Sequence, residues 1–326
     1  MTSPSLQPVS PWPHRMAVLL VCCTYPLIWV GGLVTSLKAG MAFPDWPTSG
    51  GYNMLAYPLD KWWSGPFDMF IEHGHRLFAV LVGVMTIALV LVFWRKEPRA
   101  WVRWMALAAL AAVAFQGSLG GLRVVLDHRR MAMIHGCVGP AFFGFCVALA
   151  VFTSKRWRES TGTASSPQGT RLKRLAITTA VLAYVQLVIG ALMRHIPEMA
   201  PPTEFQTVVI FHLLGAVLLA VHAIWLAALV LWRGYPSHGL RFTAWSLLTV
   251  VGIQIGLGLA TWVAKYGFPG WFQQFSFPAQ HCILANGPWQ YGLATAHMAT
   301  GSLLLAGSVV FAIRAVRFLR PLSAVD

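Results

Sequence analysis

The stretch FIEHGHRLFAVLVGVMTIALVLVFW, residues 70–94, contains an uncharged run from Leu77 to Trp94 directly after one acid, two histidines and one arginine. An apolar run of about 18 residues or more is long enough to cross a bilayer as a helix. Ionisable side chains inside such a span are costly and usually functional. The stretch therefore predicts a membrane helix with a functional site near one end.

The whole chain has the composition of a membrane protein. Of its 326 residues, 57% are hydrophobic and 10% are charged, whereas soluble domains carry about 25% charged residues. The apolar runs are continuous and do not alternate, which favours helices over a β-barrel. We expect an all-α integral membrane protein with eight spans, at 15–37, 70–94, 101–121, 132–153, 172–194, 207–232, 242–264 and 289–313.

The basic residues predict the orientation of these spans. Sixteen of the 24 lysines and arginines flank the two termini and the connections after spans two, four and six, and seven lie in the opposite connections. Because positive residues accumulate on the cytoplasmic side, both termini are predicted to be cytoplasmic. This distribution also explains the net charge of +14 without a nucleic-acid partner. The chain shows no recognisable transit peptide, so we expect a bacterial plasma membrane as its location.

A polar segment divides the chain into two halves. Residues 159–170, ESTGTASSPQGT, have the composition of a linker. With eight spans, this predicts an N-terminal four-helix bundle at 1–158, a cytoplasmic linker, and a C-terminal four-helix bundle at 171–326.

Four histidines recur at one depth. His75, His135, His212 and His297 each lie a few residues inside the outer end of an even-numbered span. Imidazole is a common axial ligand of haem iron, and bundle interiors house such cofactors. We therefore expect one bis-histidine haem site in each half. The alternative, isolated packing histidines, does not explain the repeated register, and zinc is disfavoured because neither pair has a third or fourth ligand nearby.

Odd-numbered spans carry a second recurrence. QGSLGGLRV (116–124), QLVIGALMRH (186–195) and QIGLGLATW (254–262) each begin with Gln and continue with small residues, which permit close helix contact. The two recurrences together indicate a duplicated four-helix unit.

The two halves differ beside their first histidine. On a helix, Glu72 shares a face with His75 and Arg76, whereas the matching segment before His212 reads VVIFH and has no acid. One interpretation is an ion pair that satisfies two charges. The other is a reaction site in the first half and a plain electron-transfer haem site in the second.

Seven segments together resemble the haem A synthase family, over roughly residues 15–315. No single segment is specific, but their order, spacing and place in the spans are. The segments are GGLVTSLKAGMAFPDWP (31–47), EHGHRL (72–77), QGSLGGLRV (116–124), IHG (134–136), QLVIGALMRH (186–195), FHLLGA (211–216) and TAHMATG (295–301).

The resemblance implies an oxidoreductase that converts a methyl group of haem O to a formyl group by successive hydroxylations. It implies His75 and His135 as ligands of the substrate haem, and His212 and His297 as ligands of an electron-relaying haem b. Glu72 matches an acid implicated in activity. Haem O synthase and terminal oxidase subunits are expected partners. Near the outer haem level we expect three arginines to pair with propionates: Arg76, Arg123 and Arg194.

One departure from the family pattern and two alternative functions remain. Many family members carry a cysteine pair in the first outer loop, but residues 38–69 contain no cysteine, so a role for that pair does not apply. A dihaem b-type electron carrier predicts ligands near both membrane faces, whereas all four histidines lie near one. A haem-delivery protein for oxidase assembly has no evident use for Glu72 at only one site.

Overall fold

The computed structural model describes residues 10–159, 164–165, 169–197, 199–232 and 238–320. Within these residues, eight helices are long and apolar enough to cross a membrane, which confirms the predicted all-α integral membrane fold. They are α1 (Trp12–Ser36), α3 (Phe67–Lys96), α4 (Ala100–Val125), α5 (Arg129–Thr153), α7 (Gly169–Arg194), α8 (Pro202–Trp232), α9 (His238–Tyr266) and α11 (Pro288–Phe318).

The helices extend beyond the apolar runs of the sequence. α3 begins directly after Pro66, and α8 and α11 begin with Pro202 and Pro288. Proline suits the first helical position because its φ is already helical and it lacks the N–H that would stay unbonded there. Hydrophobicity alone places these starts up to five residues too late, since the first turns are polar.

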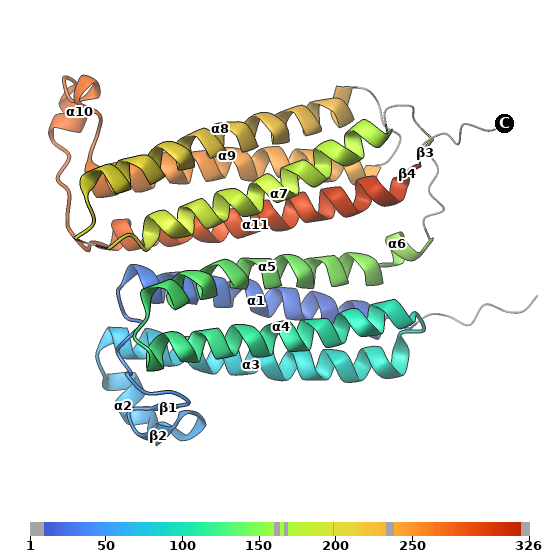
Figure 1. Cartoon of the computed structure of the whole chain (residues 1–326), viewed down its shortest axis with the longest axis horizontal. Coiled ribbons are helices and arrows are strands. Elements are labelled where there is room, and N and C mark those ends of the chain that lie inside the picture. Colours follow the sequence, from blue (N-terminus) through green and yellow to red (C-terminus); the bar gives the residue numbers. More distant parts are fainter. Residues whose placement is uncertain (1–9, 160–163, 166–168, 198, 233–237, 321–326) are drawn as a thin grey trace, which may run out of the picture.

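The helices form two bundles side by side (Figure 1). α1, α3, α4 and α5 form one, and α7, α8, α9 and α11 form the other, with α11 packed against both α1 and α5. Of the predicted linker, residues 160–163 and 166–168 lie outside the described residues. After the short helix α6 (Lys155–Glu159), strand β3 (Ala164–Ser165) pairs in parallel with β4 (Leu319–Arg320).

Each bundle has its own apolar core, and both cores stop short of the histidines. The first core residue beyond each histidine lies seven positions further along the same helix. Seven residues of α-helix span roughly 10 Å. The histidine end of each bundle is therefore outside the close-packed core. The four residues at this boundary are Val82, Phe142, Leu219 and Leu304.

Two loops with short elements of their own lie at the histidine end (Figure 1). The loop between α1 and α3 contains the hairpin β1 (Thr48–Ser49) and β2 (Tyr52–Asn53), the 3₁₀ helix η1 (Met54–Ala56) and helix α2 (Leu59–Ser64). The loop between α9 and α11 contains η2 (Gly270–Phe272) and α10 (Ser276–Ala279). The sequence patterns predict long loops here but not these elements.

The two bundles meet closely where α1 passes α11. A Cβ atom on Gly32 would collide with the side chains of Met298 and Thr295. Arg194, the last residue of α7, donates hydrogen bonds to the Gly32 carbonyl (2.7 Å) and to the Ser36 hydroxyl, and that hydroxyl lies 2.9 Å from Thr295 Oγ1. A small residue and a polar cluster thus fasten the junction at its histidine end.

We expect Gly32→Leu to destabilise the junction. Overpacking a close-packed contact costs about 1–3 kcal/mol, so the thermal unfolding midpoint in detergent should fall. The matched control is Gly83→Leu on α3, where a Cβ atom would meet nothing within 4 Å. Equal midpoints for the two variants would contradict a close approach at Gly32.

Candidate haem sites

The histidine rings of the C-terminal bundle lie edge to face, close to each other. His212 on α8 and His297 on α11 have ring centroids 6.2 Å apart, and their planes are inclined by 69°. Imidazole nitrogens bond metals at about 2 Å, so two imidazoles on opposite sides of one metal place their centroids roughly 6 Å apart. The donor type and the spacing therefore fit the two faces of one haem.

The histidines of the N-terminal bundle lie among charged residues. His75 on α3 is within electrostatic range of His135, Arg123 and Arg76, and His135 also faces Arg123. Arg123 in turn interacts with Glu72. The structure thus brings all five residues predicted for the first site to one end of one bundle, including residues from α3, α4 and α5.

Metal donors at this end come in pairs. Within the described residues, no group of three or more His, Cys, Asp or Glu side chains is placed to hold a metal ion. A haem needs only axial ligands from the protein, so a pair of imidazoles is a sufficient donor set for it.

Each imidazole rests on a glycine of a neighbouring odd-numbered span. A Cβ atom on that glycine would approach the imidazole Cε1 to 2.9–3.2 Å, closer than nearly all real Cβ contacts. Any larger residue would force the ring or the helix to shift. The four contacts are Gly31–His75, Gly120–His135, Gly190–His212 and Gly258–His297.

Glutamines four residues before three of these glycines contact the same histidines. His135 Nδ1 lies 3.1 Å from the main-chain oxygen of Gln116, whose side-chain amide donates to the His135 carbonyl at 3.0 Å. The Gln186 amide lies 3.1 Å from His212 Nδ1 and donates to the His212 carbonyl at 2.8 Å. The sequence signal is the Gln-x-x-x-Gly spacing, which by itself indicates only close helix contact.

The third glutamine repeats the arrangement. His297 Nδ1 lies 3.2 Å from the main-chain oxygen of Gln254, and the Gln254 amide is 3.5 Å from His297 Nε2. A main-chain oxygen at Nδ1, as at His135 and His297, fixes the orientation and basicity of a ligating imidazole.

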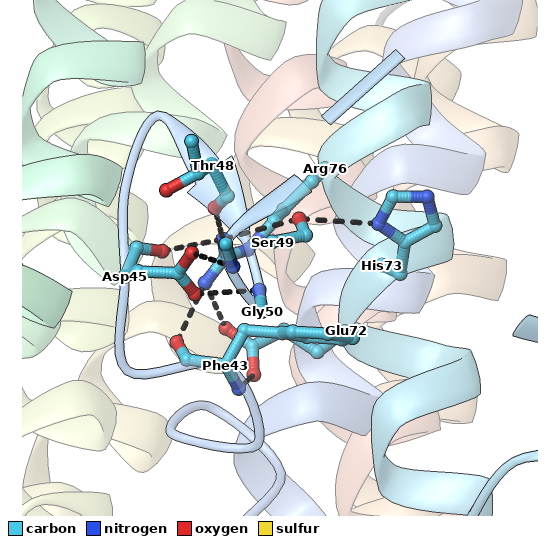
Figure 2. A network of polar contacts seen from close by, with 9 residues as sticks. Phe43, Asp45, Thr48, Ser49, Gly50, Glu72, His73 and Arg76 are labelled. Carbon is cyan, nitrogen blue, oxygen red and sulfur yellow. Dashed lines mark hydrogen bonds and ion pairs between the residues drawn. The ribbon is translucent and has the colours of Figure 1, made fainter. Parts of the chain in front are cut away.

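Glu72 and Arg76 form a buried ion pair (Figure 2). Their side chains are 1% and 8% exposed, and Arg76 Nη2 lies 2.8 Å from Glu72 Oε1. The second carboxylate oxygen accepts the Phe43 N–H at 2.9 Å. Arg76 also donates to three loop carbonyls, those of Phe43, Asp45 and Thr48, at 2.7–2.8 Å. The ion pair that the sequence suggested is therefore present, and it anchors the first outer loop.

The anchored loop contains a tight hairpin turn. Gly50 and Gly51 have φ values of +58° and +79°, a conformation that favours glycine, and their N–H groups donate to the Asp45 carboxylate at 2.8 Å each. Partial burial raises the pKa of Asp45, but hydrogen bonds from Gly51, Thr48 and Gly50 outweigh it and lower that pKa below 3.8. This stabilisation is present above the ordinary pKa and is lost as the pH falls through the lowered one.

The loop also reaches the neighbouring helix α4. A Cβ atom on Gly121 would collide with the Trp46 indole, and one on Gly40 would collide with the Arg123 guanidinium. Gly121 follows Gly120, which supports His135. The loop thus covers the histidine end of the N-terminal bundle between α3 and α4.

The three arginines predicted to bind propionates lie in different surroundings. Arg76 bonds the loop, Arg194 bonds α1 at the junction, and Arg123 lies beside both N-terminal histidines. Propionate binding stays a prediction for all three, with Arg123 best placed. His73 points to the loop, with Nδ1 3.3 Å from Ser49 Oγ.

The comparison with known families adds an independent observation. The COX15-CtaA model, described as cytochrome oxidase assembly protein, matches residues 14–205. The chain belongs to the COX15-CtaA family. The match begins within α1 and covers the rest of the N-terminal bundle, α7 and the first turn of α8.

Curated relatives of the COX15-CtaA chain match over a shorter region. The haem A synthase of Brucella anthropi is 26% identical over 156 residues, and those of Brucella ovis and Brucella abortus are 24% identical over 153. Each match covers 46% of this chain and 41% of the relative. The aligned region thus spans less than half the length of these relatives.

We expect Arg76→Met to destabilise the protein strongly, because it leaves the buried Glu72 carboxylate unpaired. Breaking one side of a buried pair costs about 3–5 kcal/mol. The thermal midpoint should fall, and proteases should cleave residues 37–58 faster.

The double variant Glu72→Met with Arg76→Met is the matched control. It removes both charges, so its loss of stability should be smaller than the sum of the two single losses by about 0.5–3 kcal/mol. Strictly additive losses would contradict an ion pair between these residues.

Proposed function

We propose that the chain is a haem A synthase, which oxidises the methyl group at one pyrrole ring of haem O to a formyl group. The observation that carries this proposal is the pair His212 and His297, whose ring centroids are 6.2 Å apart. In the other bundle His75 lies within electrostatic range of His135, with the acid Glu72 on the same helix. Membership of a cytochrome oxidase assembly family and relatives named haem A synthase support it.

The N-terminal bundle is the proposed substrate site. His75 and His135 would hold haem O, in the region between the outer loop and the core residues Val82 and Phe142. Each hydroxylation converts one C–H bond of the methyl carbon to C–OH, a two-electron oxidation that requires an external oxidant and a source of oxygen. Two such steps give a geminal diol, which loses water to leave the aldehyde. The loop anchored by Arg76 would exclude water from this end, and Arg123 would neutralise a propionate.

Glu72 is the proposed acid of this site. Carboxylates stabilise positive charge that develops in a transition state, or accept a proton from the reacting group. The buried carboxylate interacts with Arg123, which faces both N-terminal histidines. Its bonds to Arg76 and the Phe43 N–H fix its position.

The C-terminal bundle is the proposed site of haem b, held by His212 and His297, which when bound supplies one-electron redox chemistry. The two sites approach each other at α1. The Gly31 position contacts His75, and the adjacent Gly32 contacts Met298, the neighbour of His297. Helix α1, at its two adjacent glycines, therefore lies between the two histidine pairs. This proximity suits electron relay between them.

The proposal extends to the cellular setting. An integral membrane enzyme of this kind would work in a bacterial plasma membrane with both termini cytoplasmic, receive haem O from haem O synthase, and supply terminal oxidase subunits. All four histidines lie at one end of the bundles, which disfavours a carrier that moves electrons from face to face.

The direct test is haem extraction from membranes that express the chain together with a source of haem O. We expect the formyl-bearing haem to appear, and His75→Ala to abolish it. His297→Ala should mainly deplete the low-spin haem b spectrum. Unchanged haem O on fully loaded protein would overturn the proposed activity.

A second test separates chemistry from anchoring at Glu72. Glu72→Gln keeps an acceptor for the Phe43 N–H but removes the charge, so conversion should fall about 10²-fold at unchanged haem content. Arg76→Gln loosens the loop and leaves the acid in place. Equal losses in the two variants would show that Glu72 only anchors the loop.

A further inference from the structure

Two arginines meet at one glycine at the end of the bundles opposite the histidines. The short helix α6 follows α5 at this end, near the end of α11 (Figure 1). A Cβ atom on Gly239, in the first turn of α9, would come within 2.8 Å of the Arg156 guanidinium of α6. From α11, Arg314 donates hydrogen bonds to the Gly239 carbonyl at 3.1 Å and to the Thr243 hydroxyl at 2.5 Å. Both guanidinium groups therefore lie at the start of α9.

These two guanidinium groups have like charges and no acid between them. Arg314 is partly buried and lies within electrostatic range of Arg156. No ion pair among the described residues includes either of them, and the described acids at this end, Glu97 and Glu159, contact other basic residues. Because like charges repel more strongly where water is partly excluded, this arrangement favours a bound anion.

Neighbouring residues of α6 and α11 extend the basic junction. Arg317, one turn after Arg314, lies over the Trp157 indole of α6 at 5.3 Å from the ring centroid. Arg158 of α6 has a buried Nη1 atom without a hydrogen-bond partner among the described residues. Helix α6 follows the N-terminal bundle and α11 ends the C-terminal one, so basic side chains from both halves of the chain gather here.

Exposed apolar side chains lie beside this basic junction. Phe242, three residues after Gly239 on α9, is 71% exposed, and Trp245 is 60% exposed. Helix positions three residues apart are neighbours on the surface, so Phe242 lies next to the glycine that both arginines approach. A ligand with an anionic headgroup and apolar chains would contact both kinds of side chain, whereas free phosphate would contact only the arginines.

We propose that this junction binds the phosphate of an anionic phospholipid headgroup. Guanidinium groups bind phosphate oxygens through charge-assisted, often paired hydrogen bonds, and basic pockets between membrane helices bind anionic lipid headgroups. The predicted orientation places this end in the cytoplasmic leaflet, which contains anionic lipids. A lipid bound by Arg156 and Arg314 would connect α6, and through it the N-terminal half, to the C-terminal bundle.

The test uses the full chain in a neutral detergent, with thermal unfolding as the readout. A ligand that binds only the folded state raises the unfolding midpoint. We expect phosphatidylglycerol to raise the midpoint in a saturable way, and phosphatidylcholine or inorganic phosphate at the same concentrations to leave it unchanged. An equal rise with inorganic phosphate would overturn the lipid as ligand, and equal rises with the two lipids would overturn the anionic site.

Matched variants then locate the site. Arg156→Gln and Arg314→Gln should each raise the half-saturating concentration of phosphatidylglycerol about fivefold, the contribution of one basic residue at an anionic lipid surface. The control is Arg174→Gln, which removes the same charge from an exposed position on α7 at the same end and should leave that concentration unchanged. Arg156 is exposed, so its variant keeps the test decisive if Arg314→Gln does not fold. Equal losses in Arg156→Gln and Arg174→Gln would show a diffuse electrostatic effect and overturn the site, without bearing on the proposed haem chemistry.

Discussion

The contact between a helical glycine and an imidazole is the constraint on which the rest of this architecture depends. At each of four places, only a hydrogen atom on the supporting helix leaves room for the ring of the next helix. The four contacts lie about two turns from the first residues of the two apolar core clusters on the histidine helices. The position of each histidine therefore depends on helix packing.

The histidine end contains buried charge, and the outer loop makes that charge tolerable. Burying an ion pair costs hydration free energy. The attraction between the two charges offsets that cost only when their remaining donors and acceptors are also hydrogen-bonded. Arg76 meets that condition through the carbonyls of Phe43, Asp45 and Thr48, and Glu72 through the Phe43 N–H. Loop and ion pair therefore stabilise each other, and neither is expected to be ordered without the other.

Local sequence patterns were sufficient to predict the membrane spans, but not the contacts between the spans. Hydrophobicity and charge predicted eight helices in the right order, and the three- and four-residue spacings placed Glu72, His75 and Arg76 on one face. The carbonyl partners of Arg76 lie 28 to 33 positions away in a loop without periodicity, so no local pattern reveals them. Likewise, the recurrent glutamines were visible, but their contacts with histidines depend on how neighbouring helices are rotated.

The two bundles have the same arrangement of helices, and two sequence differences between them lie beside His75. Val209 stands where the N-terminal half has Glu72, and Leu27 stands where the other supporting helices have glutamine. The first difference adds a charge three residues before His75, and the second places an apolar side chain four residues before the glycine that supports it. Because the backbone register is unchanged in both cases, the duplicated scaffold keeps its geometry. The two sites thus differ in side chains at the first histidine and not in the helices that position it.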